Sequence, residues 1–433
     1  MAKKIFVKDL SKYIGKEVTL QGWVRNYRKA SSKLRFVIFR DGTGEVQAVA
    51  WKPELGEENF DKVKALTLES SVIITGIPKK HPNFENQYEL QMTGIKIIHI
   101  SEDYPIGKKD HGVDFLLSNR HLWLRSRKQN ALMKIRHTVY FAICEFLNKN
   151  GFFRFDSPIL TPNACEGTTT LFEVPYFDQG KAYLSQSGQL YLEAGIMSLG
   201  RVYDFGPVFR AEKSKTRKHL TEFWMMDAEA AYVEHKENMN IQEKLIRFVI
   251  KSVLKHNLTD LQTLERDIEA LRKADAVFKI ITYKQMIEIL QQKGIDIHYG
   301  DDMGAPEEEA LVEGSDEPIF VEKWPKHIKP FYMKVDPNDP EISLGSDLIA
   351  PEGFGEIIGG SQREDDYKIL KKRMEEDEIP INDYQWYLDL RRYGSVPHSG
   401  FGVGLERLIG WISGVRHIRE TIPFPRMLYR IYP

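Results

Sequence analysis

Alternation of apolar and polar residues through residues 17–100 constrains the fold of this chain more than any other feature. A period of two places the apolar side chains of a strand on one face. The pattern predicts three strands, a helix and two strands: EVTLQGWVRNYR, KLRFVIFRD, GEVQAVAW, the helical NFDKVKALT, SSVIITGIPKK and YELQMTGIKIIHI. This is the order of an OB-fold, a small barrel whose open face binds oligonucleotides. We assign it to residues 1–102, with another small β-barrel as the alternative.

Charge is distributed unevenly along the chain. The first 100 residues carry 17 Lys and Arg against 11 Asp and Glu, whereas the whole chain of 433 residues has a net charge of −1. A basic first domain on an acidic remainder indicates nucleic acid at that end. An ordinary solvated basic domain would explain the charge alone equally well.

Several protein classes are excluded by what the sequence lacks. The two cysteines, Cys144 and Cys165, form neither a disulfide framework nor a CxxC zinc ribbon. No GxxxxGK[ST], GxSxG, HExxH or kinase motif occurs, so nucleotide chemistry here needs another scaffold. The N-terminus has no apolar signal segment, and no apolar run reaches membrane-spanning length. We therefore expect a cytoplasmic protein with no membrane partner.

The remainder of the chain mixes strands and helices without regular βαβ alternation. This predicts an antiparallel sheet flanked by helices over residues 126–433, an α+β domain with an insertion at about 255–325. Residues 103–125 are expected to form a hinge or linker. The individual elements expected are strands at 151–160, 181–186, 201–210, 220–233 and 353–365, helices at 126–150, 236–256 and 262–273, an acidic loop at 300–317, and a glycine-led helix at 402–414.

Residues suited to a nucleotide occur in FRAEKSKTRKHLTEFW, residues 209–224. Arg210 follows an apolar strand, and its guanidinium fork matches phosphate oxygens. Glu212 suits an exocyclic amine, and Phe223 suits stacking on a base. The cationic loop between them could close over a polyphosphate.

Two further stretches would complete a nucleotide site. FGVGLERLIGW places Arg407 at a helix N-terminus after two glycines. SDLIAPEGFGEIIGG supplies Asp347 and Glu356, oxygen ligands suited to Mg²⁺ bound to phosphates. Taken singly, these residues are better explained as ordinary surface charges.

The three motifs taken in order carry a family resemblance. GFFRFDSPIL with the helix before it, FRAEKSKTRKHLTEFW and GFGVGLERL resemble motifs 1, 2 and 3 of the class II aminoacyl-tRNA synthetases, with Pro158 marking motif 1. A preceding OB-fold resembles subclass IIb, the aspartyl, asparaginyl and lysyl enzymes. The resemblance covers essentially the whole chain. It implies a homodimeric ligase that uses ATP and Mg²⁺ and binds tRNA rather than DNA.

Site residues follow from the resemblance. Arg210 and Arg407 are expected to be catalytic, by stabilising charge on the reacting phosphates. Asp347 and Glu356 are expected to hold Mg²⁺. The expected ATP site comprises Arg210, Glu212, Lys218, His219, Leu220, Phe223, Glu356, Gly404, Glu406 and Arg407. The residues expected to stack on or read anticodon bases are Trp23, Arg25, Phe36 and Gln47.

The stretch QSGQLYLEAG indicates the amino acid. In the aspartyl enzymes the corresponding stretch is similar to QSPQLYKQ, and its lysine meets the side-chain carboxylate of the substrate. This chain has Leu192 at the position of that lysine. An unpaired buried carboxylate is costly, which favours L-asparagine and tRNA(Asn). Arg363 would donate to the amide oxygen and Asp227 would accept from the amide nitrogen. The expected amino-acid site comprises Glu166, Ser187, Gln189, Leu192, Arg210, Asp227 and Arg363.

Three alternatives stay open. In asparaginyl enzymes, motif 2 usually ends in a sequence similar to WM-[IV]-E-P-E, whereas this chain has WMMDAE. Asp227 is one methylene shorter than the usual glutamate, which leaves an aspartyl enzyme as the first alternative. An asparagine synthetase built on this core would not need the OB-fold. A non-enzymatic RNA-binding paralogue would not need Arg210, Glu212, Glu356 and Arg407.

Overall fold

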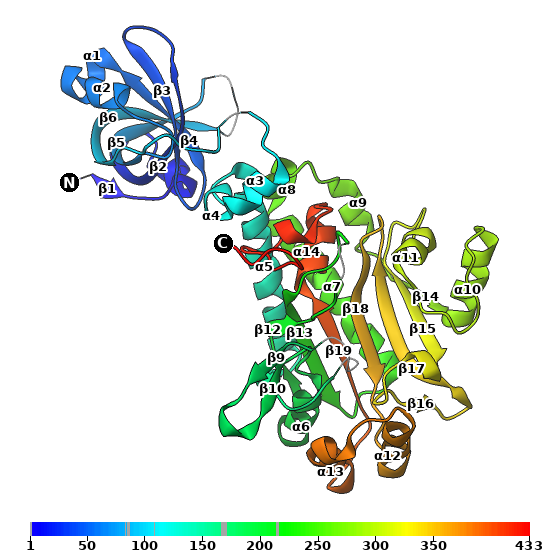
Figure 1. The fold of residues 1–433 in the computed structure, drawn as a ribbon. Coiled ribbons are helices and arrows are strands. Elements are labelled where there is room, and N and C mark those ends of the chain that lie inside the picture. Colours follow the sequence, from blue (N-terminus) through cyan, green and yellow to red (C-terminus); the bar gives the residue numbers. More distant parts are fainter. Residues whose placement is uncertain (1, 83, 85–86, 108, 166–170, 214–215) are drawn as a thin grey trace. The chain divides into compact units, whose positions relative to one another are not determined.

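The structure is a computed structural model that describes residues 2–82, 84, 87–107, 109–165, 171–213 and 216–433 (Figure 1). The chain divides into two compact units, Met1–Gly112 and Val113–Pro433. The boundary lies inside the stretch expected to be a linker, because its second half forms α3 (Val113–Ser118) and α4 (Arg120–Trp123). Buried Arg120 holds α4 in the second unit by donating to the carbonyl oxygens of Glu420, Ile422 and Pro423.

The first unit is a small barrel with the predicted order of elements. β2 pairs with β5 through its first half and with β3 through its second half, which closes the barrel. Gly22 makes this bend possible, since a Cβ there would lie 2.1 Å from the carbonyl oxygen of Arg40. The OB-fold prediction is confirmed. The elements are β1 (Lys3–Lys4), η1 (Val7–Tyr13), β2 (Val18–Lys29), β3 (Leu34–Arg40), β4 (Glu45–Trp51), α1 (Lys52–Leu55), α2 (Glu57–Lys64), β5 (Ser71–Lys80) and β6 (Tyr88–His99).

A largely antiparallel sheet forms the centre of the second unit, as predicted. Its described strands run in the order β14-β15-β17-β18-β19-β13-β11-β7, with β12 beside β13 and β16 beside β17. Among these pairs, β14–β15 and β11–β7 are parallel. The strands are β7 (Phe153–Arg154), β11 (Arg201–Tyr203), β12 (Gly206–Phe209), β13 (Glu222–Ala231), β14 (Lys279–Thr282), β15 (Ile319–Pro325), β16 (Val335–Asp336), β17 (Asp339–Ala350), β18 (Gly355–Gln362) and β19 (His398–Gly404). A smaller sheet joins β8 (Leu160–Thr161), β9 (Glu173–Pro175) and β10 (Lys181–Leu184).

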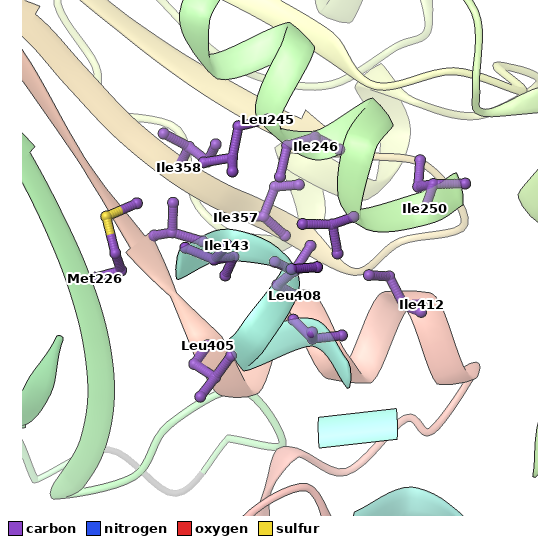
Figure 2. Close-up of a cluster of buried hydrophobic side chains, with 14 of the residues drawn as sticks. Ile143, Met226, Leu245, Ile246, Ile250, Ile357, Ile358, Leu405, Leu408 and Ile412 are labelled. Carbon is purple, nitrogen blue, oxygen red and sulfur yellow. The ribbon is translucent and has the colours of Figure 1, made fainter. Parts of the chain in front are cut away.

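Three helices, α5, α7 and α14, cover one face of this sheet. α7 and α14 contact its central strands, and α5 packs against both of these helices. The apolar side chains of all three meet those of β18 in the core shown in Figure 2. Ile143, Ile246, Leu408 and Ile358 are almost fully buried there. Burial of each such side chain contributes about 1.5–3 kcal/mol. The three helices are α5 (Arg127–Lys149), α7 (His235–His256) and α14 (Leu405–Ser413).

Further helices complete the second unit. They are α6 (Gln189–Leu199), α8 (Leu258–Thr263), α9 (Ile268–Lys273), α10 (Tyr283–Gln292), α11 (Ala305–Leu311), α12 (Tyr367–Glu376), α13 (Gln385–Arg392), η3 (Phe177–Gln179), η4 (Lys326–Ile328), η5 (Ile381–Tyr384) and η6 (Ile418–Glu420). In the part of the chain that the structure describes, no helix is long and apolar enough to cross a membrane.

Four expectations about elements were wrong. The glycines of the expected helix 402–414 belong to β19, and the helix begins at Leu405. The expected helix 262–273 is interrupted, because Glu265 has a φ of 61° between α8 and α9. The acidic loop 300–317 contains α11. Only strands were named within 170–234, but the helix α6 lies between the first two of them.

Candidate active site

A cavity of about 380 Å³ opens on the face of the sheet opposite helices α5, α7 and α14. Strand alternation explains its floor. On β13, Met226 and Ala228 enter the core, whereas Met225 and Asp227 line the cavity. The cavity brings together fifteen predicted site residues: Ser187, Gln189, Arg210, Glu212, Lys218, His219, Leu220, Phe223, Asp227, Asp347, Glu356, Arg363, Gly404, Glu406 and Arg407.

Arg210 lies at the end of β12, where the backbone is fixed. Its N–H donates to the carbonyl oxygen of Thr221 at 3.0 Å, and its guanidinium carbon lies 5.6 Å from the centre of the Phe223 ring. A cation and an aromatic face are therefore presented side by side. This arrangement suits a phosphate attached to a purine that stacks on the ring.

His219 lies deeper in the same loop. Its Nε2 is 3.7 Å from a carboxylate oxygen of Glu212, and its Nδ1 contacts the Thr216 hydroxyl. Burial lowers the pKa of His219, and the charge of Arg407 lowers it further. Both effects favour the neutral imidazole, which can still hydrogen-bond.

The first turn of α14 places Arg407 at the cavity and anchors Glu406 behind it. Arg407 Nη1 donates to the carbonyl oxygen of Glu356 at 3.0 Å. Glu406 was expected in the ATP site, but both of its oxygens are engaged: Arg136 donates to one at 2.6 Å and the Trp224 N–H to the other at 2.9 Å. Glu406 therefore fixes α14 against α5 and β13.

Two carboxylates and a lysine occupy the position expected for magnesium. Lys329 Nζ donates to Asp347 Oδ2 at 2.7 Å and lies 3.8 Å from the centre of the Trp324 ring. Burial raises the pKa of Asp347 to about 7, although Lys329 acts in the opposite direction. Glu356 lies nearby, and its charge also acts to raise this pKa. Lys329 was not predicted from the sequence.

The donor set tests whether a magnesium ion fits. Among the described residues, no group of three or more His, Cys, Asp or Glu side chains could hold a metal. Mg²⁺ is typically bound by one or two carboxylates together with substrate phosphates. Asp347 and Glu356 therefore fit an ion that arrives with a triphosphate, but not a permanent protein-bound metal.

Polar groups that suit an amide line the other end of the cavity. Asp227 Oδ2 accepts from the Ser187 hydroxyl and from the Gly188 N–H, both at 2.9 Å. The other oxygen, Oδ1, faces Gly402, where a Cβ would lie 2.6 Å away. Burial raises the pKa of neighbouring Asp204 to about 8, and the charge of Asp227 adds to this effect.

Arg363 lies beside Asp227 and is held by an ion pair. Its Nε donates to Glu229 at 3.1 Å, its Nη2 also contacts Glu229, and its Nη1 donates to the Ser361 hydroxyl at 2.7 Å. Arg363 is 3% exposed and Glu229 1% exposed, so the pair is held inside the protein. These bonds fix the guanidinium, which also lines the cavity.

Comparison with known proteins assigns this architecture. Residues 112–428 match the family of class II tRNA synthetases for D, K and N. The chain belongs to this family. Residues 18–98 of this class II synthetase match the OB-fold nucleic acid binding domain.

Relatives resemble the class II synthetase over its full length. An asparagine–tRNA ligase of Desulforamulus reducens is 51% identical and covers 99% of both chains. One of Chloroflexus aurantiacus is 52% identical, covering 99% of this chain and 98% of the relative. The crystal structure of asparaginyl-tRNA synthetase from Pyrococcus horikoshii complexed with asparaginyl-adenylate is 45% identical, with a TM-score of 0.95 over 100% of both chains.

Two predicted amino-acid contacts of the synthetase are not found in the cavity. Glu166 lies outside the described residues. Leu192 is fully buried in a separate apolar cluster with Ile196 and Val202 and does not line the cavity. The reason is α6, which was not predicted: residues 192 and 196 are one turn apart and share a face directed at β11.

The predicted anticodon residues share one face of the barrel. Strand register places Trp23 opposite Arg40, Phe36 opposite Arg28, and Gln47 opposite Ile38, all on the side away from the core. Trp23 is 42% exposed. Arg25 is paired with Glu45 at 3.0 Å, so its charge is partly neutralised.

A buried network behind the amino-acid end was missed from the sequence. Glu193 on α6 accepts from Gln189 at 3.1 Å, Tyr387 at 2.8 Å, Arg391 at 2.5 Å and His398 at 3.1 Å. Burial alone would raise the pKa of Glu193, but Arg391 and His398 hold it below its usual range. The network fixes Gln189, which lines the cavity. The sequence signal available was an acid within the apolar stretch 190–196.

Proposed function

We propose that this synthetase joins L-asparagine to tRNA(Asn), using ATP, through an asparaginyl-adenylate. The observation that carries the proposal is a single cavity with cations and an aromatic ring at one end and the fixed Asp227 and Arg363 at the other. Its relation to the Pyrococcus horikoshii enzyme, whose structure contains asparaginyl-adenylate, supports the same substrates.

The first step needs positioning and charge stabilisation rather than a protein nucleophile. An α-carboxylate oxygen of asparagine attacks the α-phosphorus of ATP, and the bond to the β-phosphate breaks. Arg210 stabilises the charge on the α-phosphate, with Phe223 stacked on the adenine and Glu212 accepting from its amine. Arg407, Lys218 and His219 receive the outer phosphates. Mg²⁺ held by Asp347 and Glu356 would neutralise the leaving pyrophosphate.

The amide side chain is read by two fixed groups. Ser187 and Gly188 hold Asp227 through Oδ2, so that Oδ1 accepts from the amide nitrogen. Arg363 donates to the amide oxygen. In the second step the 3′-terminal hydroxyl of tRNA attacks the adenylate carbonyl, and AMP leaves.

An aspartyl-tRNA synthetase is the second candidate, because its motif 2 also ends with an aspartate at the position of Asp227. The lysine that meets the substrate carboxylate in aspartyl enzymes is replaced in this chain by Leu192. The carboxylate of aspartate would therefore face that of Asp227, which is only 5% exposed, without that cation. Two like charges in a buried site disfavour each other strongly. Asparagine introduces no such charge.

Homodimer formation is part of the proposal and concerns motif 1. Phe141 on α5 and Phe153 on β7 are 56% and 57% exposed, and Leu160 on β8 is 43% exposed. Large exposed apolar side chains of this kind suit an interface between two copies. Light scattering should give twice the chain mass, and a monomer at micromolar concentration would contradict this part.

Aminoacylation of transcribed tRNA tests the whole reaction. The wild-type protein should charge tRNA(Asn) with asparagine. Phe36→Ala should lower this charging by about tenfold or more, because stacking on a base contributes about 1–3 kcal/mol. ATP–pyrophosphate exchange, which needs no tRNA, should not change. Phe6→Ala, which removes an exposed ring outside β2, β3 and β4, is the control. Equal charging by the Phe36→Ala variant and the wild type would contradict the role of this face.

A further inference from the structure

The acidic segment 300–317 places a buried carboxylate against two residues that line the cavity, Lys218 and Glu356. Its helix α11 begins at Ala305, where Glu307 accepts from the Gly304 N–H, and α11 packs against β18. Three successive glutamates follow Pro306. Glu308 is only 8% exposed, whereas its neighbour Glu309 is exposed. One acid of this segment is therefore directed inward.

Both carboxylate oxygens of Glu308 are engaged with the proposed ATP site. Oε2 accepts from Lys218 Nζ at 2.9 Å, and Oε1 accepts from the backbone N–H of Glu356 at 3.3 Å. The side chains of Lys218 and Glu308 are 21% and 11% exposed. The pair is thus largely shielded from water, where it is less weakened by screening than a surface ion pair.

The backbone beside this contact leaves no room for another side chain. Gly355 has a φ of 81°, and a Cβ there would lie 2.3 Å from Glu308 Oε2 and 2.8 Å from Lys218 Nζ. Only glycine combines this backbone conformation with such close approach. Glu308, Lys218 and Gly355 therefore form one closely fitted unit at the start of β18.

We propose that Glu308 is a positioning residue that holds Lys218 and the Glu356 backbone in place for the triphosphate of ATP. The inference rests on the proposed function. A lysine ammonium has three donors on a long flexible stem, and ordering that stem is entropically costly. Glu308 uses one donor and fixes the stem before ATP arrives, leaving two donors for phosphate oxygens. It acts through Lys218 and does not touch the substrate.

Glu308→Gln is the central test, with Glu309→Gln on the same helix as the matched control. The neutral amide keeps the shape but loses the charge-assisted bond. We expect the KM for ATP in pyrophosphate exchange, and the dissociation constant for ATP from calorimetry, to rise about tenfold, as for loss of one charged hydrogen bond. The KM for asparagine should stay unchanged, and Glu309→Gln should match the wild type. The thermal unfolding midpoint of Glu308→Gln should fall, because a shielded ion pair loses one charge.

A second variant separates positioning from general destabilisation. Combining Glu308→Gln with Lys218→Ala should weaken ATP binding no further than Lys218→Ala alone, because the two side chains act as one unit. Glu308→Asp should recover part of the affinity. A KM for ATP equal to that of Glu309→Gln, or a lower one, would overturn the inference while leaving the proposed function intact. A wild-type protein that neither binds ATP nor catalyses exchange would overturn both.

Discussion

At the scale of residues, the site depends on a few charges held by buried partners. Arg363 is fixed by Glu229, Asp227 by Ser187 and Gly188, and Lys218 by Glu308. Arg210 differs because its proposed role is to stabilise charge that develops in the reaction. Each supporting group reduces the freedom that substrate binding would otherwise have to restrict.

Arg210→Ala should lower the rate of ATP–pyrophosphate exchange by about a hundred- to a thousandfold, as for loss of one charge-stabilising donor. The thermal unfolding midpoint should barely change, because Arg210 lies at the cavity surface. The exchange rate of Arg210→Lys, which keeps the charge but not the guanidinium fork, should lie between those of the wild type and Arg210→Ala. Exchange at the wild-type rate by Arg210→Ala would rule out its catalytic role.

Asp204 makes stability depend on pH. Its pKa in the folded protein is about 8 against an ordinary value of 3.8, so the folded state binds its proton more tightly than the unfolded state. Stability from this group is therefore complete at acidic pH and is lost as pH rises from about 4 toward 8. Asp204→Asn, which mimics the protonated form, should gain more stability over the wild type at pH 8 than at pH 5. Denaturant unfolding at both pH values measures this, and an equal difference at the two would contradict it.

At the scale of elements, alternation predicted the strands that have a core face and a solvent face. Residues 17–100 were predictable because side-chain direction has a period of two. β19 was missed because its glycines, at positions 400, 402 and 404, leave no polar and apolar alternation to detect. α6 was missed because most of its residues are buried on all sides, which removes the helical period.

The position of α6 changes what Leu192→Lys should do. The side chain is fully buried against Ile196 and Val202, so a lysine there would bring an unpaired charge into an apolar cluster. We expect a loss of several kcal/mol in unfolding free energy rather than a change of substrate. Leu192→Met should be tolerated, with a cost below about 1.5 kcal/mol. A stable Leu192→Lys variant that selected aspartate would show that the side chain reaches the substrate.

At the scale of the whole molecule, the order of the three motifs after the OB-fold was the main basis for predicting the fold and the site. The motif residues could be assigned to one site because the three motifs, in this order, resemble those of the class II synthetases. Lys329, Glu193 and Arg391 were not predictable, since their importance comes from partners far away in the sequence. Glu193, for example, meets His398 only after α6 and β19 pack together. Burial of charge is a property of the folded chain.

ATP–pyrophosphate exchange with asparagine and aspartate in parallel, without tRNA, tests the central claim most directly. We predict exchange with asparagine and little with aspartate, because Asp227 accepts from an amide, and no lysine stands at position 192 to pair with a second carboxylate. Failure of that discrimination should appear as comparable rates with the two amino acids. Exchange with aspartate alone would contradict the account and assign the cavity to an aspartyl enzyme.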